Sequence, residues 1–175
     1  NYSNLPIGIS TNSFEIYQAY KKEMDIKIVQ IALNPLDFKF NESFIKQLHK
    51  DNVSIQIRSV LSSGLLSAKY DEDSIFTDNM RKRYHDKKNY DNYSKRINTS
   101  SEIIKYLHNS LNVDLKDIPI FLYSLFEKLP NVQCVVRGGS SLNQIIKNTK
   151  SYPINGKVKE DLYNKMKLEW GCEYV

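Results

Sequence analysis

Cysteine and histidine are scarce in this sequence, and the scarcity limits the kinds of protein that it can encode. Its 175 residues include two cysteines and three histidines. Cys134 and Cys172 are too few for the disulfide framework of a small secreted domain, so we expect a reducing, cytoplasmic location. The cysteines and histidines also lack the close spacing of zinc ligands, and the sequence therefore predicts no metal site.

Long apolar runs are also missing, as are the features of an exported chain. No stretch approaches the roughly 18 to 20 apolar residues that span a bilayer, so no membrane partner is predicted. The first residues contain no basic segment followed by an apolar one, which is the pattern of a secretory leader. The sequence opens on Asn1 and enters a strand-like segment almost at once, which suggests a piece of a longer fold.

The remaining composition is that of an ordinary globular protein. Hydrophobic residues make up 41% of the chain and charged residues 26%, enough for one core with a charged exterior. The length suits a single domain over residues 1–175, because lone domains commonly contain about 100 to 200 residues. The net charge of +5 favours weak contact with anions such as nucleic acid, membrane surfaces or a phosphorylated cofactor, without choosing among them.

Strand and helix patterns alternate along the chain. Short apolar runs rich in Ile and Val predict strands at residues 5–10, 26–33, 53–61 and 132–136. Helical periodicity is found at residues 13–24, 44–48, 103–111, 115–126, 141–148 and 157–168. Ser13, Ser100 and Ser141 are placed to cap helices. We expect strands that are apolar on both faces, in a parallel α/β sheet or part of a barrel.

Residues 68–99 show no sustained hydrophobic period and are rich in Lys, Arg, Asp, Asn and Tyr. A stretch of this length is typically a functional lid or a disordered loop, and we expect a loop, with short helices at most. Residues 80–96 mix basic side chains with Tyr, a composition that can follow a phosphate backbone and stack on bases. Asp86 and Asp91 dilute the positive charge, so a solvated lid is favoured and nucleic acid is not predicted as a partner.

Four segments form a pattern in the order IGIST at 7–11, VQIALN at 29–34, SVLSSGLL at 59–66 and VVRGGSSLNQIIKN at 135–148. In this order they resemble the second half of an aldo/keto reductase. The last segment is similar to that family's final strand, phosphate-binding turn and following helix. The resemblance covers nearly the whole chain and implies the C-terminal half of a (β/α)8 TIM barrel. From the residues alone, Gly138 and Gly139 would let the backbone approach a phosphate, although simple turn chemistry is an alternative.

The resemblance implies a nicotinamide cofactor and suggests the residues that hold it. Ser10 and Gln30 would hydrogen-bond the nicotinamide carboxamide, although a buried Gln is also compatible with ordinary core hydrogen bonding. Ser59, Leu61 and the Gly64 loop would line the pyrophosphate. The residues implied at or beside the adenosine end are Arg137, Gly138, Gly139, Ser140, Gln144 and Asn148. Positive charge would help to bind a 2'-phosphate, with Arg137 the nearest candidate, so NADPH is expected rather than NADH.

Two positions depart from the family's pattern. Thr11 stands where the family often has Asn, and Arg58 stands where an aromatic ring commonly stacks on the nicotinamide. Arg58 could lay its planar guanidinium over that ring, or it could form a salt bridge with a neighbouring carboxylate. The sequence leaves these two interpretations open.

The implied reaction is hydride transfer from NADPH to an aldehyde or ketone. The family's catalytic Asp, Tyr, Lys and His come from strands upstream of Leu5, so no catalytic residue is assigned and the isolated chain is expected to be inactive. His49, His85 and His108 lack an acid-base partner at recognisable spacing and are expected at the surface. The alternative is a non-catalytic half barrel that binds a nucleotide or a protein. Its unpaired edge strands would pair with the missing half or with a second copy.

Overall fold

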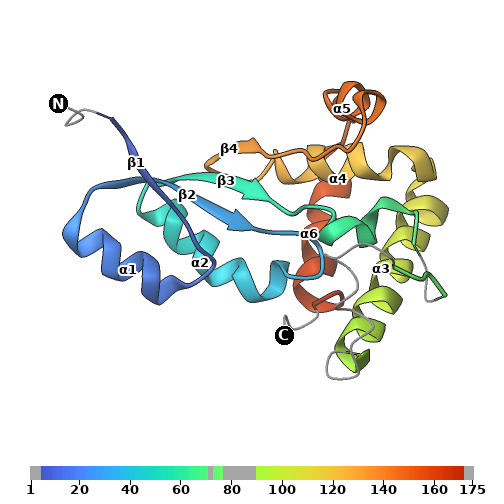
Figure 1. Ribbon diagram of the computed structural model, residues 1–175, viewed down its shortest axis with the longest axis horizontal. Coiled ribbons are helices and arrows are strands. Elements are labelled where there is room, and N and C mark those ends of the chain that lie inside the picture. Colours follow the sequence, from blue (N-terminus) through green and yellow to red (C-terminus); the bar gives the residue numbers. More distant parts are fainter. Residues whose placement is uncertain (1–4, 71–72, 77–89, 172–175) are drawn as a thin grey trace.

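The computed structural model describes residues 5–70, 73–76 and 90–171, and it contains one parallel sheet (Figure 1). The strands of its four-stranded sheet follow the sequence in space, as β1 (Ile7–Ser10), β2 (Ile26–Ala32), β3 (Ser54–Arg58) and β4 (Val132–Val135). All three pairings are parallel. The carboxyl ends of the four strands therefore meet at one edge of the sheet.

Helices connect and cover the strands. They are α1 (Phe14–Glu23), α2 (Phe38–Lys50), α3 (Tyr90–Leu111), α4 (Ile118–Phe126), α5 (Leu142–Asn148) and α6 (Gly156–Leu168), with 3-10 segments η1 (Ser62–Ser67) and η3 (Leu115–Asp117). Two of the predicted caps are confirmed, because the hydroxyl of Ser13 accepts from the Ile16 amide at 3.1 Å and that of Ser141 from the Gln144 amide at 3.3 Å.

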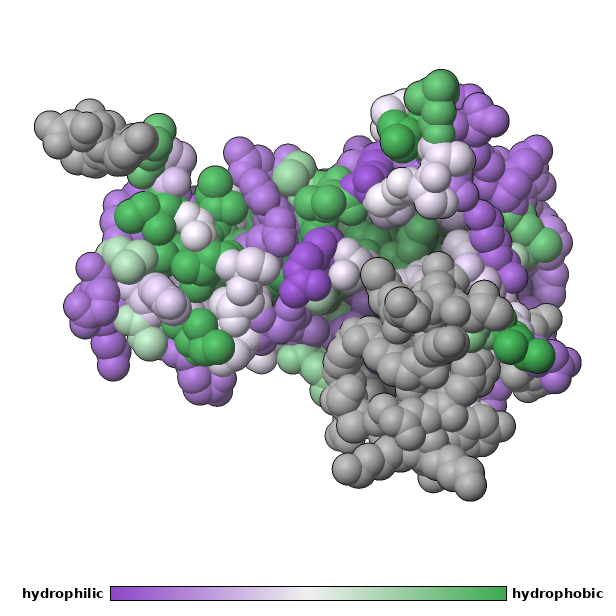
Figure 2. Space-filling model, viewed as in Figure 1, coloured by the Kyte–Doolittle hydropathy of each residue, from purple (hydrophilic) through white to green (hydrophobic). Residues whose placement is uncertain are grey.

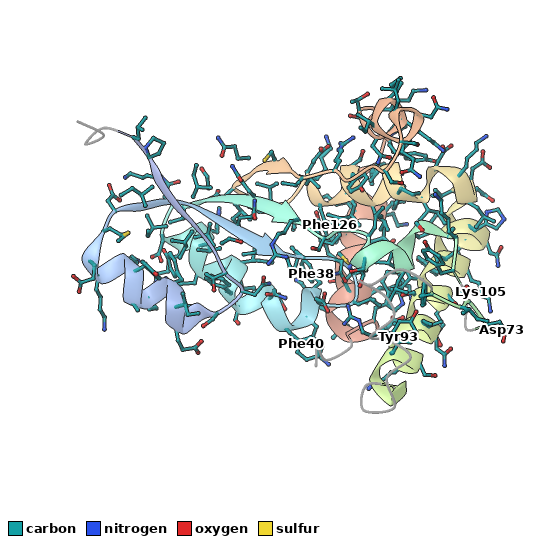
Figure 3. The ribbon with its side chains drawn as sticks, in the orientation of Figure 1. Phe38, Phe40, Asp73, Tyr93, Lys105 and Phe126 are labelled. Atoms are coloured by element: carbon teal, nitrogen blue, oxygen red, sulfur yellow. The ribbon has the colours of Figure 1, made fainter. Side chains whose placement is uncertain are left out.

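The main core lies between the sheet and its helices. Val29, Ile31, Ile55 and Ile57 alternate along β2 and β3, and each is at most 1% exposed. Burying a side chain of this size stabilises the fold by about 1.5–3 kcal/mol. Phe38, the first residue of α2, packs against Phe126 of α4 with ring centroids 6.3 Å apart, and Figure 3 shows the two side chains lying together.

Polar side chains lie on the opposite face of the sheet, so the prediction of strands that are apolar on both faces was wrong. Strand register aligns four side chains in one row across this face, Ser10, Gln30, Gln56 and Cys134. They are half-buried or exposed, whereas Val29, Ile31, Ile55 and Ile57 on the other face of β2 and β3 are buried. The reason is that successive side chains of a strand point to opposite faces, so the buried apolar residues of β2 and β3 alternate with polar residues on the open face.

The prediction of a loop throughout residues 68–99 was wrong for residues 90–99, which form the start of α3. Tyr93, Arg96, Ile97, Ser100 and Ile103 are buried at spacings of one helical turn. Two of these core positions hold polar residues, which hid the helical period. Ser100 lies inside the helix rather than at its cap, and its hydroxyl donates to the Arg96 carbonyl at 2.7 Å.

The rest of the predicted loop is only partly described. Residues 71–72 and 77–89 lie outside the described residues, and a role for residues 68–99 as a lid stays a prediction. Phe76 packs with Tyr93, Ile97 and Leu65 in a second, smaller hydrophobic cluster. This cluster attaches the start of α3 to η1.

Both outer strands leave an edge open within the described part of the chain. Neither β1 nor β4 pairs with a further strand there. Large apolar residues are exposed near β1, including Ile7 at 46% and Phe14 at 40%, and on α5, including Leu142 at 71% and Ile146 at 55%. Figure 2 shows hydrophobic surface over the β1 end and on α5. Among the helices described, none is long and apolar enough to cross a membrane.

Candidate functional site

Ser10 and Gln30 form a polar pair on the open face of the sheet. Strand register places Ser10 opposite Gln30, and the Ser10 hydroxyl donates to Gln30 Oε1 at 3.2 Å. Within the described residues, the Nε2 group of Gln30 has no hydrogen-bond acceptor. The pair thus keeps the NH2 group of Gln30 as a donor and the Ser10 hydroxyl oxygen as an acceptor for a ligand.

Arg58 ends the neighbouring strand β3 on the same face, where it pairs in register with Ala32. Its Nη1 donates to the Ser59 hydroxyl at 3.4 Å. The described residues place no carboxylate within ion-pair distance of Arg58, so the salt-bridge interpretation has no partner there. Gln56, which was not among the expected site residues, lies beside Gln30 on this face. The alternation of Gln56 with Ile55 and Ile57 was the signal that could have found it.

The chain turns sharply after β3, at residues 59–64. Ser59, Ser62 and Ser63 have φ angles of 62°, 47° and 56°. A left-handed conformation costs a residue other than glycine about 1–2 kcal/mol. Gly64, at φ 96°, adopts such a conformation with less strain, and a Cβ there would lie 3.1 Å from the Tyr70 ring. Leu61 is half-buried and packs against the main core.

A buried polar cluster that no sequence pattern indicated lies against this turn. Arg96 donates to both carboxylate oxygens of Asp37, at 2.8 and 3.3 Å, and to the Ser62 hydroxyl at 2.9 Å. Asn34 donates to the same carboxylate at 2.6 Å and to the Ser59 carbonyl at 3.3 Å. Asp37 and Arg96 are 59 residues apart in the chain. No local pattern could have indicated this contact.

Arg137 follows β4 and is engaged with neighbouring protein groups. Its guanidinium donates to the Glu127 carboxylate and to the carbonyls of Asn148 and Lys150, and it lies over the Tyr123 ring at 5.4 Å from the centroid. These bonds use three of the five N–H donors of an arginine. The side chain is 15% exposed. Most of its charge is therefore turned toward the protein.

The turn after Arg137 is exposed and bonded to itself. The Ser140 amide and hydroxyl donate to Gln144 Oε1 at 2.8 and 3.0 Å, and Asn148 Nδ2 donates to the Gly138 carbonyl at 2.6 Å. A Cβ at Gly139 would lie 3.0 Å from Ile145 Cγ1 and 3.3 Å from the Ile145 amide nitrogen, so a larger residue there would require these atoms to shift.

Tyr123 of α4 lies next to Gly138. Burial raises the pKa of Tyr123, although a hydrogen bond with the Gly138 backbone and the positive charge of Arg137 act in the opposite direction. Gly138 itself is exposed, and a Cβ there would meet no atom of the described structure within 4 Å.

The expected site residues lie at the carboxyl ends of the strands or in the segments that follow them. Ser10, Gln30, Arg58 and Ser59 lie at or near the carboxyl ends of three adjacent strands. The Val136 amide donates to the Ile57 carbonyl at 2.7 Å, which places the start of the β4–α5 segment directly beside the end of β3. Ligands of parallel α/β proteins bind at this end of the strands. The remaining residues, Leu61, Gly64, Gly138, Gly139, Ser140, Gln144 and Asn148, follow in the two connecting segments.

The two histidines that the structure describes lie at the surface and are not among the expected site residues. His49 and His108 are exposed, as expected, and His85 lies outside the described residues. His49 Nδ1 is 3.0 Å from Asn131 Oδ1, and His108 Nδ1 is 3.0 Å from the Val113 carbonyl. Across residues 5–70, 73–76 and 90–171, no three His, Cys, Asp or Glu side chains gather into a group that could hold a metal ion.

Comparison with known proteins places the chain in a family. It is similar to a glycerol dehydrogenase from Gluconobacter oxydans, with a TM-score of 0.65 and 16% identity over 92% of this chain and 48% of that one. It thus spans about half the length of that protein, and the likeness shows a shared fold. No curated protein matches the sequence. The model of the aldo/keto reductase family, however, matches residues 5–166, and the chain therefore belongs to the aldo/keto reductase family.

Proposed function

We propose that this chain is the C-terminal, cofactor-binding half of an NADPH-dependent oxidoreductase that reduces an aldehyde or ketone. Family membership supports oxidoreductase chemistry on a small carbonyl substrate. The observation that carries the proposal is the contact between Ser10 and Gln30 on the open face of the sheet.

The groups at the ends of β1–β3 fit the nicotinamide end of such a cofactor. A carboxamide has one carbonyl acceptor and one NH2 donor. Gln30 Nε2 can donate a hydrogen bond to the carboxamide carbonyl of the cofactor. The Ser10 oxygen can accept one from the carboxamide NH2, while the Ser10 hydroxyl still donates its hydrogen bond to Gln30 Oε1. Arg58, with its planar guanidinium on the same face, would take the place of the aromatic ring.

The fit at the adenosine end is less complete. Gly138 is exposed and open, which suits the approach of a phosphate to the backbone. Gln144 and Asn148, however, bond to Ser140 and to Gly138, and these bonds would be exchanged for bonds to the nucleotide. The binding of a 2'-phosphate by Arg137 would rely on the donors that the protein leaves unused. The preference for NADPH over NADH therefore has to be tested separately from cofactor binding itself.

The role of the chain would be to bind the cofactor and to orient its nicotinamide ring. The bound cofactor would supply the hydride, while Ser10, Gln30 and Arg58 would hold the ring that carries it. The proton donor and its partners, the Tyr, Asp, Lys and His implied by the family, correspond to strands upstream of Leu5. We therefore expect the chain to bind the cofactor without turning over an aldehyde or ketone.

The test is a calorimetric titration of the chain with NADPH and with NADH. Gln30→Ala should weaken binding about tenfold, which corresponds to roughly 1.4 kcal/mol. Gln133→Ala is the matched control, because Gln133 is an exposed glutamine on β4 with no assigned role. The proposal fails if the unsubstituted chain binds neither dinucleotide, or if the two variants bind equally well.

The second candidate function is a non-catalytic half barrel that binds a nucleotide or a protein. It is favoured by the open edges of β1 and β4 and by the exposed apolar residues of α1 and α5. The partner would be the other half of a barrel or a second copy of the chain. Sedimentation of the chain across a range of concentrations tests self-association. A monomer at every concentration would remove the second copy as the partner.

A further inference from the structure

A single buried carboxylate is connected at two points to the turn at residues 59–64. Asp37 accepts hydrogen bonds from Asn34 and Arg96. Asn34 also donates to the carbonyl of Ser59, at the start of the turn, and Arg96 also donates to the hydroxyl of Ser62, in the middle of the turn. Asp37 therefore helps to fix the turn at two points, through Asn34 and through Arg96.

Asp37 is itself held firmly in place. Its amide donates to the Asn34 carbonyl at 3.1 Å, and its carbonyl accepts from Asn41 Nδ2 at 2.8 Å. The next residue, Phe38, is 3% exposed in the main core, where its ring stacks on that of Tyr163. Asp37 also occupies the N-cap of α2, yet among the residues described its carboxylate bonds no amide of that helix. It points to Arg96 instead of capping.

The turn needs such support because its backbone is strained. Ser59, Ser62 and Ser63 all have positive φ angles, which residues other than glycine rarely adopt. Strained backbone persists only where the surrounding contacts hold it, and it concentrates at functional sites. The hydrogen bonds from Asn34 and Arg96 reach two of the residues concerned, Ser59 and Ser62.

Stability alone does not explain a charged pair in this place. Asp37 is 5% exposed and Arg96 is 8% exposed. Moving two charges out of water costs several kcal/mol for each ion, and apolar residues of similar volume are often as stabilising or more so. The charged pair contributes geometric specificity, because its directional hydrogen bonds fix the positions of the groups that it contacts.

We propose that Asn34, Asp37 and Arg96 are positioning residues that hold the turn at residues 59–64 in the shape that receives the pyrophosphate of the cofactor. The inference rests on the proposed function, since it assumes that the turn binds this group. Because Arg96 belongs to α3, the placement of that helix becomes part of the cofactor site. None of the three residues needs to touch the ligand.

The test uses Ser62→Ala, which removes the acceptor of the Arg96 hydrogen bond and keeps the Asp37–Arg96 ion pair. Ser124→Ala is the matched control, because Ser124 of α4 is also buried, at 2% exposed. Its hydroxyl accepts a hydrogen bond from the Tyr152 amide at 2.8 Å. The ligand is ADP-ribose, which contains the pyrophosphate. We expect Ser62→Ala to weaken its binding about fivefold, the effect of one net hydrogen bond of about 1 kcal/mol. Ser124→Ala should leave the affinity unchanged.

A second measurement needs no nucleotide. Hydrogen exchange at the amides of residues 61–66 should become faster in Ser62→Ala than in Ser124→Ala, because the turn loses one of its two attachments. Unchanged exchange in Ser62→Ala, or equal loss of ADP-ribose binding in both variants, overturns the inference. If the unsubstituted chain does not bind ADP-ribose, the pyrophosphate site fails together with the proposed function, and the exchange result still shows whether the cluster holds the turn.

Discussion

The two sides of the candidate site are held in place by different kinds of contact. At the ends of β1–β3, the turn at residues 59–64 depends on Asp37 and Arg96, which are 59 residues apart. In the β4–α5 segment the bonds are local, such as those between Ser140 and Gln144, which are four residues apart. The first side exists only once the sheet and α3 have come together, whereas the second is determined largely by its own sequence.

Burial follows the same division. Asn34, Asp37 and Arg96 are 1%, 5% and 8% exposed, whereas the apolar residues Leu142 and Ile145 of α5 are 71% and 52% exposed. Figure 1 shows α5 projecting at the periphery, beyond the end of β4. Regions with few buried contacts open at low free-energy cost. We therefore expect the ends of β1–β3 to be the stable side of the site and α5 to be the adaptable side.

The largest effect is expected from breaking the buried ion pair. Arg96→Met should leave Asp37 uncompensated and lower the free energy of unfolding by about 3–5 kcal/mol in urea titrations. Lys27→Met is the control, because the ion pair of Lys27 with Asp25 is exposed, at 57% and 78%, and such pairs contribute about 1 kcal/mol or less. Equal losses in the two variants would contradict the view that long-range burial holds this side of the site.

A smaller effect should separate the helix-facing core of the sheet from α5. Ile57→Ala, at a position with 0% exposure, should lower the free energy of unfolding by about 3 kcal/mol, because it removes buried methyl groups and leaves a cavity. Ile145→Ala, the same substitution at 52% exposure, should change it by about 0.5 kcal/mol or less. A large loss in Ile145→Ala would show that α5 is more firmly packed than its exposure indicates.

The smallest effect should be confined to α5. Ser141→Ala removes the N-cap hydrogen bond to the Gln144 amide and should destabilise the helix by about 1 kcal/mol. Hydrogen exchange of the α5 amides should become faster while exchange in β2 and β3 stays the same. Ser151→Ala, at an exposed position after the helix, is the control. Faster exchange throughout the sheet would mean that α5 unfolds together with the core and is not a separate unit.

Pattern reasoning found most of the elements on both sides of the comparison. Alternation and Ile/Val content located the four strands, and the caps at Ser13 and Ser141 located the starts of α1 and α5. It failed where polar residues occupy core positions, as Arg96 and Ser100 do in α3. It also failed for the open face of the sheet, because which face a helix covers depends on the path of the chain between strands.

By itself, the sequence determined the order of strands and helices, the glycine turn and cap of the β4–α5 segment, and the resemblance that led to the family. These features depend on residues close together in the chain. Only the tertiary structure decided that Ser10 meets Gln30, that Gln56 joins their face, and that Asp37 meets Arg96. The physical reason is that hydrogen bonds and ion pairs act over a few ångströms, and the packing of the whole sheet and its helices selects which distant residues come within that range.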